Sequence, residues 1–349
     1  MTDAAPRTPL RNGLTVALLA AGLAGLVLAA CTLGVVHIPP DEVLRGLLDG
    51  LTGGVSGAAD SLDSTGAGIL FDVRLPRILT CTAVGFGLAV AGAVFQGLLL
   101  NPLADPFTLG VSSGAAFGAA LALLLGLAFL GPATLLVLAF AGAALTLAAV
   151  ISLAGRDGEL SPASLILAGV IVSAILSAGI SCIKYLADER VSVIVFWLMG
   201  SFVGRTPQDA ALAGAAALFA FAVCLYFARD LNVMSLGTRP ARSLGVNTGR
   251  VRLILLVTAS LVSAVCVAVS GVIGFVGLIV PHLMRMVVGP DNRWLLPASG
   301  LGGAILLLAA DTVTRAFLPH EVPIGVLTAL IGGPVFCWIF SRSRRLSRG

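Results

Sequence analysis

Long apolar runs alternate with short polar connections along almost the whole chain. A helix crosses the ~30 Å hydrocarbon layer of a bilayer with about 20 apolar residues, and ten runs approach that length. The runs are continuous rather than alternating in hydrophobicity, which favours helices over barrel strands. We predict an all-α polytopic membrane protein with ten crossings, at 14–36, 75–99, 107–129, 133–154, 163–186, 207–228, 251–270, 272–289, 295–316 and 323–341.

Two apolar segments need separate interpretation. Residues 191–204 are too short to cross comfortably, so we predict a short, partly inserted helix on the periplasmic side. The first run follows Arg7 and Arg11 and ends in LAAC, a pattern shared with signal peptides and lipoprotein cleavage sites. Because the run exceeds a typical signal core and a polytopic chain follows it, we interpret it as the first membrane helix.

Composition supports the bilayer as solvent. Of the 349 residues, 58% are hydrophobic and only 11% are charged, too little polar surface for a water-soluble fold. The 42 glycines favour close helix packing, since small residues let helix backbones approach each other in membranes. Two sets have suitable spacing, namely Gly110, Gly114 and Gly118, and Gly271, Gly274 and Gly277.

The distribution of positive charge predicts the orientation. With the N-terminus in the cytoplasm, fourteen of the 21 Lys and Arg residues fall inside and seven outside, as the positive-inside rule expects. Both termini are then cytoplasmic. We predict one permease domain over 1–349, with a cytoplasmic tail at 1–13, an acidic periplasmic loop at 37–73 and a cytoplasmic segment at 229–250.

The chain offers little chemistry of its own. Its six cysteines stand singly in apolar runs, its three histidines are far apart, and Lys184 is its only lysine. A phosphate-binding P-loop requires a lysine after its glycines, so ATP is not bound in that manner. Asp311 is the exceptional acidic residue within a run, and we expect it to pair with Arg315 one helical turn later.

A basic segment, GTRPARSLGVNTGRVR at 237–252, interrupts the apolar sequence. Pro240 suits a first helical turn and Gly245 a helix end, and Ala241 and Leu244 can share a face. The segment is therefore either an ordinary basic loop beside anionic lipid or a short surface helix that receives force from a soluble partner.

Long blocks of the chain resemble permeases of the FecCD type, the membrane subunits of binding-protein-dependent ABC importers for iron-siderophores, haem and cobalamin. The blocks, in the same order as in the family, are RLPR (74–77), GLAVAGAVFQGLLLNPLADPFTLGVSSGA (87–115), LILAGV (165–170), WLMGSF (197–202), LNVMSLGTRPARSLGVN (231–247), GVIGFVGLIVPHLMRMVVGPDNR (271–293), LLLAADTVTR (306–315) and EVPIGVLTALIGGPVF (321–336).

The resemblance implies a permease in the bacterial inner membrane, with ten helices and short coupling helices. Its implied partners are a second copy of itself, two ABC ATPase subunits, a periplasmic binding protein and the lipid bilayer. It implies no nucleic acid, cofactor or metal in the chain and no catalysis by it. The cargo class is haem, ferric siderophore or cobalamin, and the sequence does not distinguish between them.

The resemblance also assigns roles to individual residues. ATPase coupling falls on the basic segment, at Arg239, Ala241, Arg242, Leu244 and Gly245. Docking of the binding protein falls on Arg74, Arg77 and Arg315. The cytoplasmic gate falls on two loops, at Asn101, Leu103, Pro162 and Ala163. Relatives often have Thr and Ser at the last two positions, so this gate is expected to be more apolar here.

The alternative function is a stand-alone channel or an ion-coupled carrier. Such carriers usually place ionisable groups inside the membrane, and the predicted crossings are nearly free of them. A membrane enzyme would need a nucleophile or metal cluster, which the pattern does not supply. The sequence therefore favours a passive pathway that takes its energy from another protein.

Overall fold

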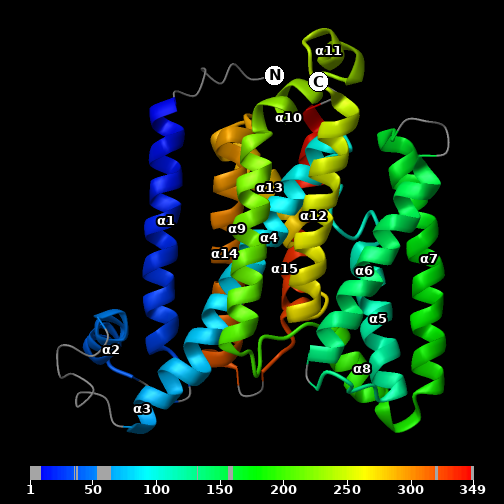
Figure 1. Cartoon of the computed structure of the whole chain (residues 1–349). Coiled ribbons are helices and arrows are strands. Elements are labelled where there is room, and N and C mark those ends of the chain that lie inside the picture. The colour runs from blue at the N-terminus through cyan, green and yellow to red at the C-terminus, as the bar shows by residue number, and fades with distance from the viewer. Residues whose placement is uncertain are drawn as a thin grey trace.

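The computed structural model describes residues 9–34, 36, 38–52, 64–131, 133–155, 160–318 and 321–346. Within these ranges the chain forms helices and loops and no β-strand (Figure 1). The helices are α1 (Pro9–Thr32), α2 (Pro40–Thr52), α3 (Ser64–Gly68), a π-helical segment (Ile69–Arg74), α4 (Leu75–Leu98), α5 (Val111–Leu125), α6 (Ala133–Ala154), α7 (Pro162–Leu186), a 3₁₀ turn (Asp188–Arg190), α8 (Val191–Leu198), α9 (Pro207–Tyr226), α10 (Ala228–Met234), α11 (Thr238–Ser243), α12 (Thr248–Ser270), α13 (Val276–Val288), α14 (Asn292–Phe317) and α15 (Ile324–Leu346).

The predicted crossings correspond to ten of these helices. In the described part of the chain, seven helices are long and apolar enough to span a membrane: α1, α4 with the residues before it (Gly66–Leu98), α6, α7, α9, α12 and α14. Three shorter apolar helices, α5, α13 and the apolar part of α15, account for the other predicted crossings. The all-α multi-pass architecture is therefore confirmed, and the apolar segment at 191–204 contains the short helix α8.

The acidic segment 37–73 contains helical structure that its composition did not predict. The helix α2 begins with Pro40, and Asp41 and Glu42 lie in its first turn. Proline is tolerated at this position, and acidic side chains there interact favourably with the helix dipole. Between its charges the helix carries apolar residues, of which Val43 is fully buried. Nearer to the crossing, α3 and the π-helical segment extend α4 toward the N-terminus.

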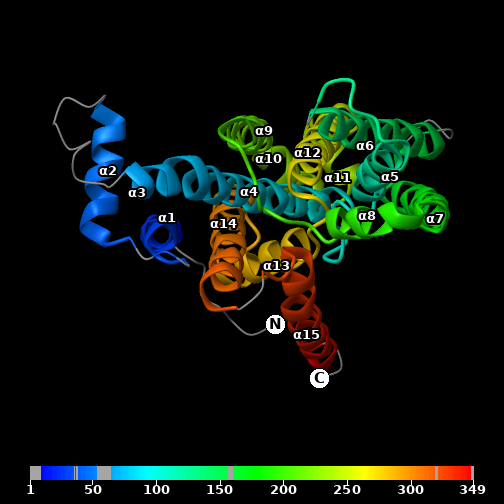
Figure 2. The same ribbon diagram turned by 90° about the horizontal axis from the view of Figure 1, so that it is seen from below.

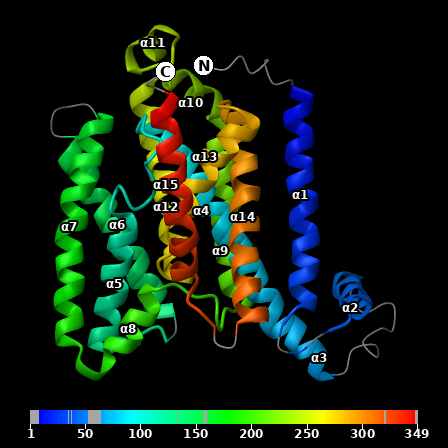
Figure 3. The ribbon, with the colours of Figure 1, turned by 180° about the vertical axis from the view of Figure 1, so that it is seen from behind.

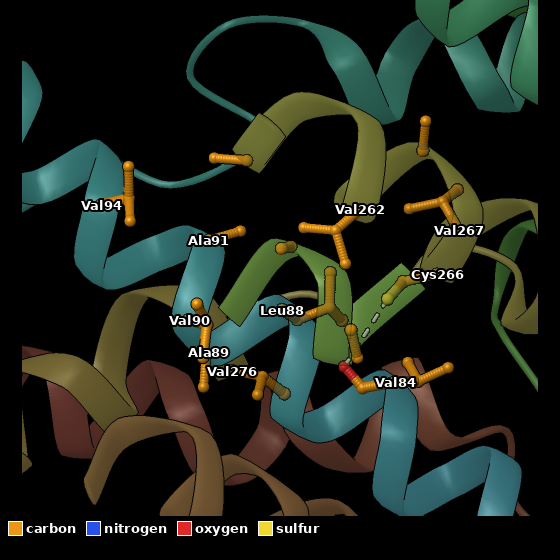
Figure 4. Close-up of a cluster of buried hydrophobic side chains, with 14 of the residues drawn as sticks. Val84, Leu88, Ala89, Val90, Ala91, Val94, Val262, Cys266, Val267 and Val276 are labelled. Atoms are coloured by element: carbon orange, nitrogen blue, oxygen red, sulfur yellow. Dashed lines mark hydrogen bonds between the residues drawn. The ribbon is translucent and has the colours of Figure 1, made fainter. Parts of the chain in front are cut away.

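Helix α4 forms the centre of the bundle. It packs against α14, α9, α12 and α13, and Figure 2 shows these helices on both sides of it. Val84, Leu88 and Val94 of α4 belong to the buried apolar core, which continues into Val262 of α12 (Figure 4). The Cys266 thiol donates a long hydrogen bond of 3.8 Å to the Val84 carbonyl oxygen, which ties α12 to α4.

Glycines let the backbones of the central helices touch. A Cβ atom on Gly92 of α4 would lie 1.9 Å from the carbonyl oxygen of Gly277 in α13, and one on Gly85 would lie 2.4 Å from that of Gly303 in α14. Among the predicted sets, Gly114 and Gly118 lie against α6 in this way, whereas a Cβ on Gly274 would meet nothing within 4 Å. The packing role is thus confirmed for part of each predicted set.

Helices α5, α6, α7 and α8 form a second group at one side of the centre. Helix α12 contacts both α4 and α6 and so joins this group to the central helices. Figure 3 shows α7 at one edge of the molecule, α1 and α2 at the opposite side, and α15 in front of the centre. Much of α7 is exposed, including Leu167 and Ile175.

Candidate functional site

The short helices α10 and α11 lie at one end of the bundle. The same end carries the start of α1 and the end of α15, whereas α2, α3 and α8 lie at the other end (Figure 1). The basic segment therefore lies at the same end of the bundle as the start of α1 and the end of α15. This is expected when successive crossings alternate in direction. Which side faces the cytoplasm remains the prediction made from the Lys and Arg distribution.

Buried apolar side chains and two glycines fix the shape of this segment. Leu231 and Met234 anchor α10 in the core. The chain then turns at Gly237, whose φ of 106° is accessible mainly to glycine. Gly245, with φ of 85°, ends α11, and the Val246 amide donates a 3.1 Å hydrogen bond to the Ala241 carbonyl oxygen. Helix α11 is therefore held at both ends.

Helix α11 presents a cationic and apolar surface outward. Arg239, Arg242, Leu244 and Gly245 are exposed, and 66% of Leu244 is accessible. Ala241 is fully buried and anchors the helix. The expectation that Ala241 and Leu244 share a face is therefore wrong, because Ala241 is buried and Leu244 is exposed. Exposed arginine beside exposed leucine suits contact with a protein more than free solution.

A polar cluster joins α10 to the start of α14. The Asn232 side-chain amide donates to Asp291 Oδ1 at 2.7 Å, and its oxygen accepts from both the backbone and the side chain of Asn292 at 2.8 and 2.7 Å. Hydrogen bonds from Arg293, followed by those from Asn232, hold the pKa of Asp291 below its ordinary value. Movement of α10 is thereby tied to α14, which packs directly on α4.

The three arginines predicted to dock a binding protein lie together at the end opposite α11. Arg74, Arg77 and Arg315 border a pocket of about 230 Å³ with Glu321. All three are at least nine-tenths buried. Arg74 Nη1 donates to the Cys31 carbonyl oxygen at 2.5 Å, and Arg315 Nη2 donates to that of Ala30 at 2.6 Å. These two guanidinium groups thus bind the terminal carbonyls of α1, which lack partners within the helix.

The expected ion pair between Asp311 and Arg315 is wrong. Asp311 is fully buried and instead pairs with Arg77, which donates to it from Nε at 3.0 Å and from Nη2 at 2.8 Å. Arg77 also reaches Glu321 at 3.0 Å. The pairing across two helices neutralises the carboxylate of Asp311. A docking role for the three arginines stays a prediction, and the structure shows that they already bind partners within the chain.

The two predicted gate loops each have a defined local structure. Asn101 accepts a 3.0 Å hydrogen bond from the Leu103 amide, and Leu103 is exposed. Ser161 caps α7 by accepting a 3.1 Å hydrogen bond from the Ser164 amide, and it places Pro162 in the first helical turn and Ala163 on the surface. The described structure records no bond between the two loops.

Sequence reasoning missed the residues that connect these sites. Asn232 lies within a block used for the resemblance, but its contacts with Asn292 and Asp291 are distant in sequence. Arg252 was grouped with the basic surface segment, yet it is buried. Across the described residues, no group of three or more His, Cys, Asp or Glu side chains is arranged to hold a metal ion.

Comparisons with known proteins identify the family of this chain. The model of the FecCD transport family matches residues 21–342. The hemin transport system permease protein HmuU of Yersinia pestis is 42% identical and covers 80% of this chain and 85% of its own length. The cobalamin import system permease protein BtuC of Halobacterium salinarum is 43% identical over 78% of this chain and 73% of its own.

A solved structure is also similar over nearly the whole length. It is described as an inward-facing conformation of a metal-chelate type ABC transporter, and it matches with a TM-score of 0.82 and 34% identity over 94% of this chain and 98% of its own. The family model and the identities of the relatives lead to the same conclusion. The chain belongs to the FecCD transport family.

Proposed function

We propose that this chain is the membrane-spanning permease subunit of a binding-protein-dependent ABC importer. Two copies would enclose the pathway, two ATPase subunits would bind at the end that carries α11, and a periplasmic binding protein would bind at the end that carries α2 and α8. The observation that carries the proposal is the exposed cationic and apolar surface of α11, on a helix anchored at both ends, in a chain of this family.

The proposed cargo class is a metal chelate. Support comes from relatives named for hemin and cobalamin and from the structure described as a metal-chelate type transporter. A large chelate needs a wide pathway without strong binding sites, since tight binding would slow its release. The carboxylate that the sequence places inside a crossing, Asp311, is neutralised by Arg77, so it offers no free charge to a coupling ion.

The proposal also assigns roles to single residues. We assign contact with the ATPase to Arg239, Arg242, Leu244 and Gly245, with Ala241 as the anchor beneath them. We assign docking of the binding protein to Glu321, whose side chain is 43% exposed, together with the small accessible parts of Arg74, Arg77 and Arg315. Leu103 and Ala163 are the exposed members of the proposed gate.

The substitution Arg242→Glu tests this proposal. Reversing the charge on an exposed arginine opposes docking of a complementary surface, and a cost of ~1.4 kcal/mol already gives a tenfold effect. We expect uptake by the reconstituted importer to fall at least about tenfold, while the protein still inserts and extracts from membranes normally. The measurement is ATP-driven uptake into proteoliposomes beside the rate of ATP hydrolysis.

The control is Lys184→Glu, the same charge change near the far end of α7. It is expected to leave coupling intact. Normal uptake and coupling by a well-expressed Arg242→Glu protein would contradict the assignment of α11 as the ATPase contact.

A further inference from the structure

One buried arginine joins the proposed ATPase-contact helix to the proposed gate. Arg252 lies in the first turns of α12 and is 7% exposed. Its Nη1 donates a 2.6 Å hydrogen bond to the Leu160 carbonyl oxygen, and its Nη2 lies 3.4 Å from Thr238 Oγ1. The planar fork of a guanidinium holds two acceptors in a fixed relation, which a flexible ammonium group does not.

The two acceptors belong to segments with different proposed roles. Thr238 is the first residue of α11. Leu160 directly precedes Ser161, the cap that sets Pro162 and Ala163 at the start of α7. The sequence separation of Arg252 is 14 residues from Thr238 and 92 from Leu160. A single side chain therefore bridges a local helix and a distant loop.

A second contact connects the exposed surface of α11 to the start of α12. Arg242 Nε donates a 3.2 Å hydrogen bond to Thr248 Oγ1, and Thr248, the first residue of α12, is 2% exposed. Force applied at Arg242 would thus reach the start of α12, and Arg252 lies on the next turn of the same rigid helix. Coupling between sites travels through such contiguous, packed contacts.

We propose that Arg252 is a positioning residue that makes the gate segment 160–163 move together with α11. The inference rests on the proposed function, because it needs an ATPase that moves α11. It assigns the guanidinium no contact with cargo or nucleotide. If the buried charge of Arg252 served only stability, its removal would lower the yield of folded protein. If the side chain transmits movement, its removal lowers the amount of cargo transported per ATP hydrolysed.

The test uses the full importer, with ATPase and binding protein, in proteoliposomes. In Arg252→Gln the side chain keeps an amide donor but cannot hold both acceptors. We expect the ratio of cargo transported to ATP hydrolysed to fall at least about fivefold, within the usual range of coupling free energies. Complex assembly and the hydrolysis rate are expected to stay near wild-type values. Arg252→Lys retains the charge on a single donor nitrogen, and its ratio is expected to lie between those of wild type and Arg252→Gln.

The matched control is Arg250→Gln, an exposed arginine on the same helix, which should leave the ratio unchanged. An unchanged ratio in Arg252→Gln, with a wild-type importer that transports normally, would overturn the inference. A wild-type importer that shows no ATP-driven uptake would instead overturn the proposed function, so the two failures are distinguishable.

A cross-link tests the inference without changing Arg252. Leu160→Cys and Thr238→Cys are combined with Cys182→Ser and Cys337→Ser, which remove the exposed thiols. The pair is joined with a short bifunctional thiosulfonate reagent. Thr238→Cys removes one acceptor of Arg252, and the cross-link replaces that connection. If both segments move as one, the cross-linked importer should transport at least as well as the same protein does before cross-linking. A cross-link that blocks transport would show that they move apart and would overturn the inference.

Discussion

Gly92→Ala is expected to prevent assembly of the native bundle. The added methyl group would lie 1.9 Å from the Gly277 carbonyl oxygen and 2.5 Å from its Cα atom. These are backbone atoms of α13, so no side chain can rotate away, and the two helices must separate. Overpacking of a closely packed core costs ~1–3 kcal/mol or more, and here it acts on the central helix. We expect little monodisperse protein after extraction in detergent, measured by size-exclusion chromatography.

Gly214→Ala is the matched control for this substitution. Gly214 lies inside α9, and a Cβ atom there would meet nothing within 4 Å. The same chemical change is therefore expected not to lower yield or thermal stability. Equal yields and melting temperatures for Gly92→Ala and wild type would contradict the contact between α4 and α13 on which this fold depends.

Asp311→Ala is expected to have the second large effect. The carboxylate is fully buried and accepts hydrogen bonds from Arg77 Nε and Nη2. Removing the carboxylate leaves Arg77 Nε and Nη2 without their acceptor and leaves only the partly exposed Glu321 as a counter-ion. Breaking a buried pair costs up to ~3–5 kcal/mol. We expect a marked fall in the apparent melting temperature of the purified protein, followed by tryptophan fluorescence in detergent.

Glu321→Gln provides the contrast at the same arginine. Its side chain is 43% exposed and contacts Arg77 Nη1 at 3.0 Å, so its loss should cost no more than ~1 kcal/mol. Replacing the pair together, as Arg77→Leu with Asp311→Leu, is expected to recover part of the stability lost in Asp311→Ala. Equal destabilisation by Asp311→Ala and Glu321→Gln would contradict the buried pair.

Hydrophobicity located the helices of all ten predicted crossings, but it placed the start of two of them too early. The runs at 107–129 and 272–289 were expected to be helical from the start, yet α5 begins only at Val111 and α13 only at Val276. Leu109 and Ile273 are buried in the loops that precede these helices. Apolar residues in a buried loop give the same hydrophobic pattern as those of a helix. The positive φ angles of Gly110 and Gly271, which interrupt the helical conformation, are visible only in the structure.

Local pattern predicted the position of α11 and missed its partners. Proline, glycine and charge allowed a short surface helix but left an ordinary basic loop as the alternative, and the resemblance to FecCD permeases favoured the helix. Which of Ala241 and Leu244 faces inward depends on the helices packed against α11, and a local pattern does not contain them. The partners of Asp311 and Arg252 come from helices and loops distant in sequence. A spacing rule such as i,i+4 considers only neighbours, so it chose Arg315.

Uptake by proteoliposomes of defined composition tests the central claim, that this chain is a passive pathway driven from α11 by a separate ATPase. Vesicles that contain the chain alone are compared with vesicles that also contain the ATPase, both supplied with ATP inside and with the loaded binding protein outside. The account predicts accumulation of cargo only when the ATPase is present, and none in the presence of an ion gradient alone. Concentrative uptake by the isolated chain would contradict it.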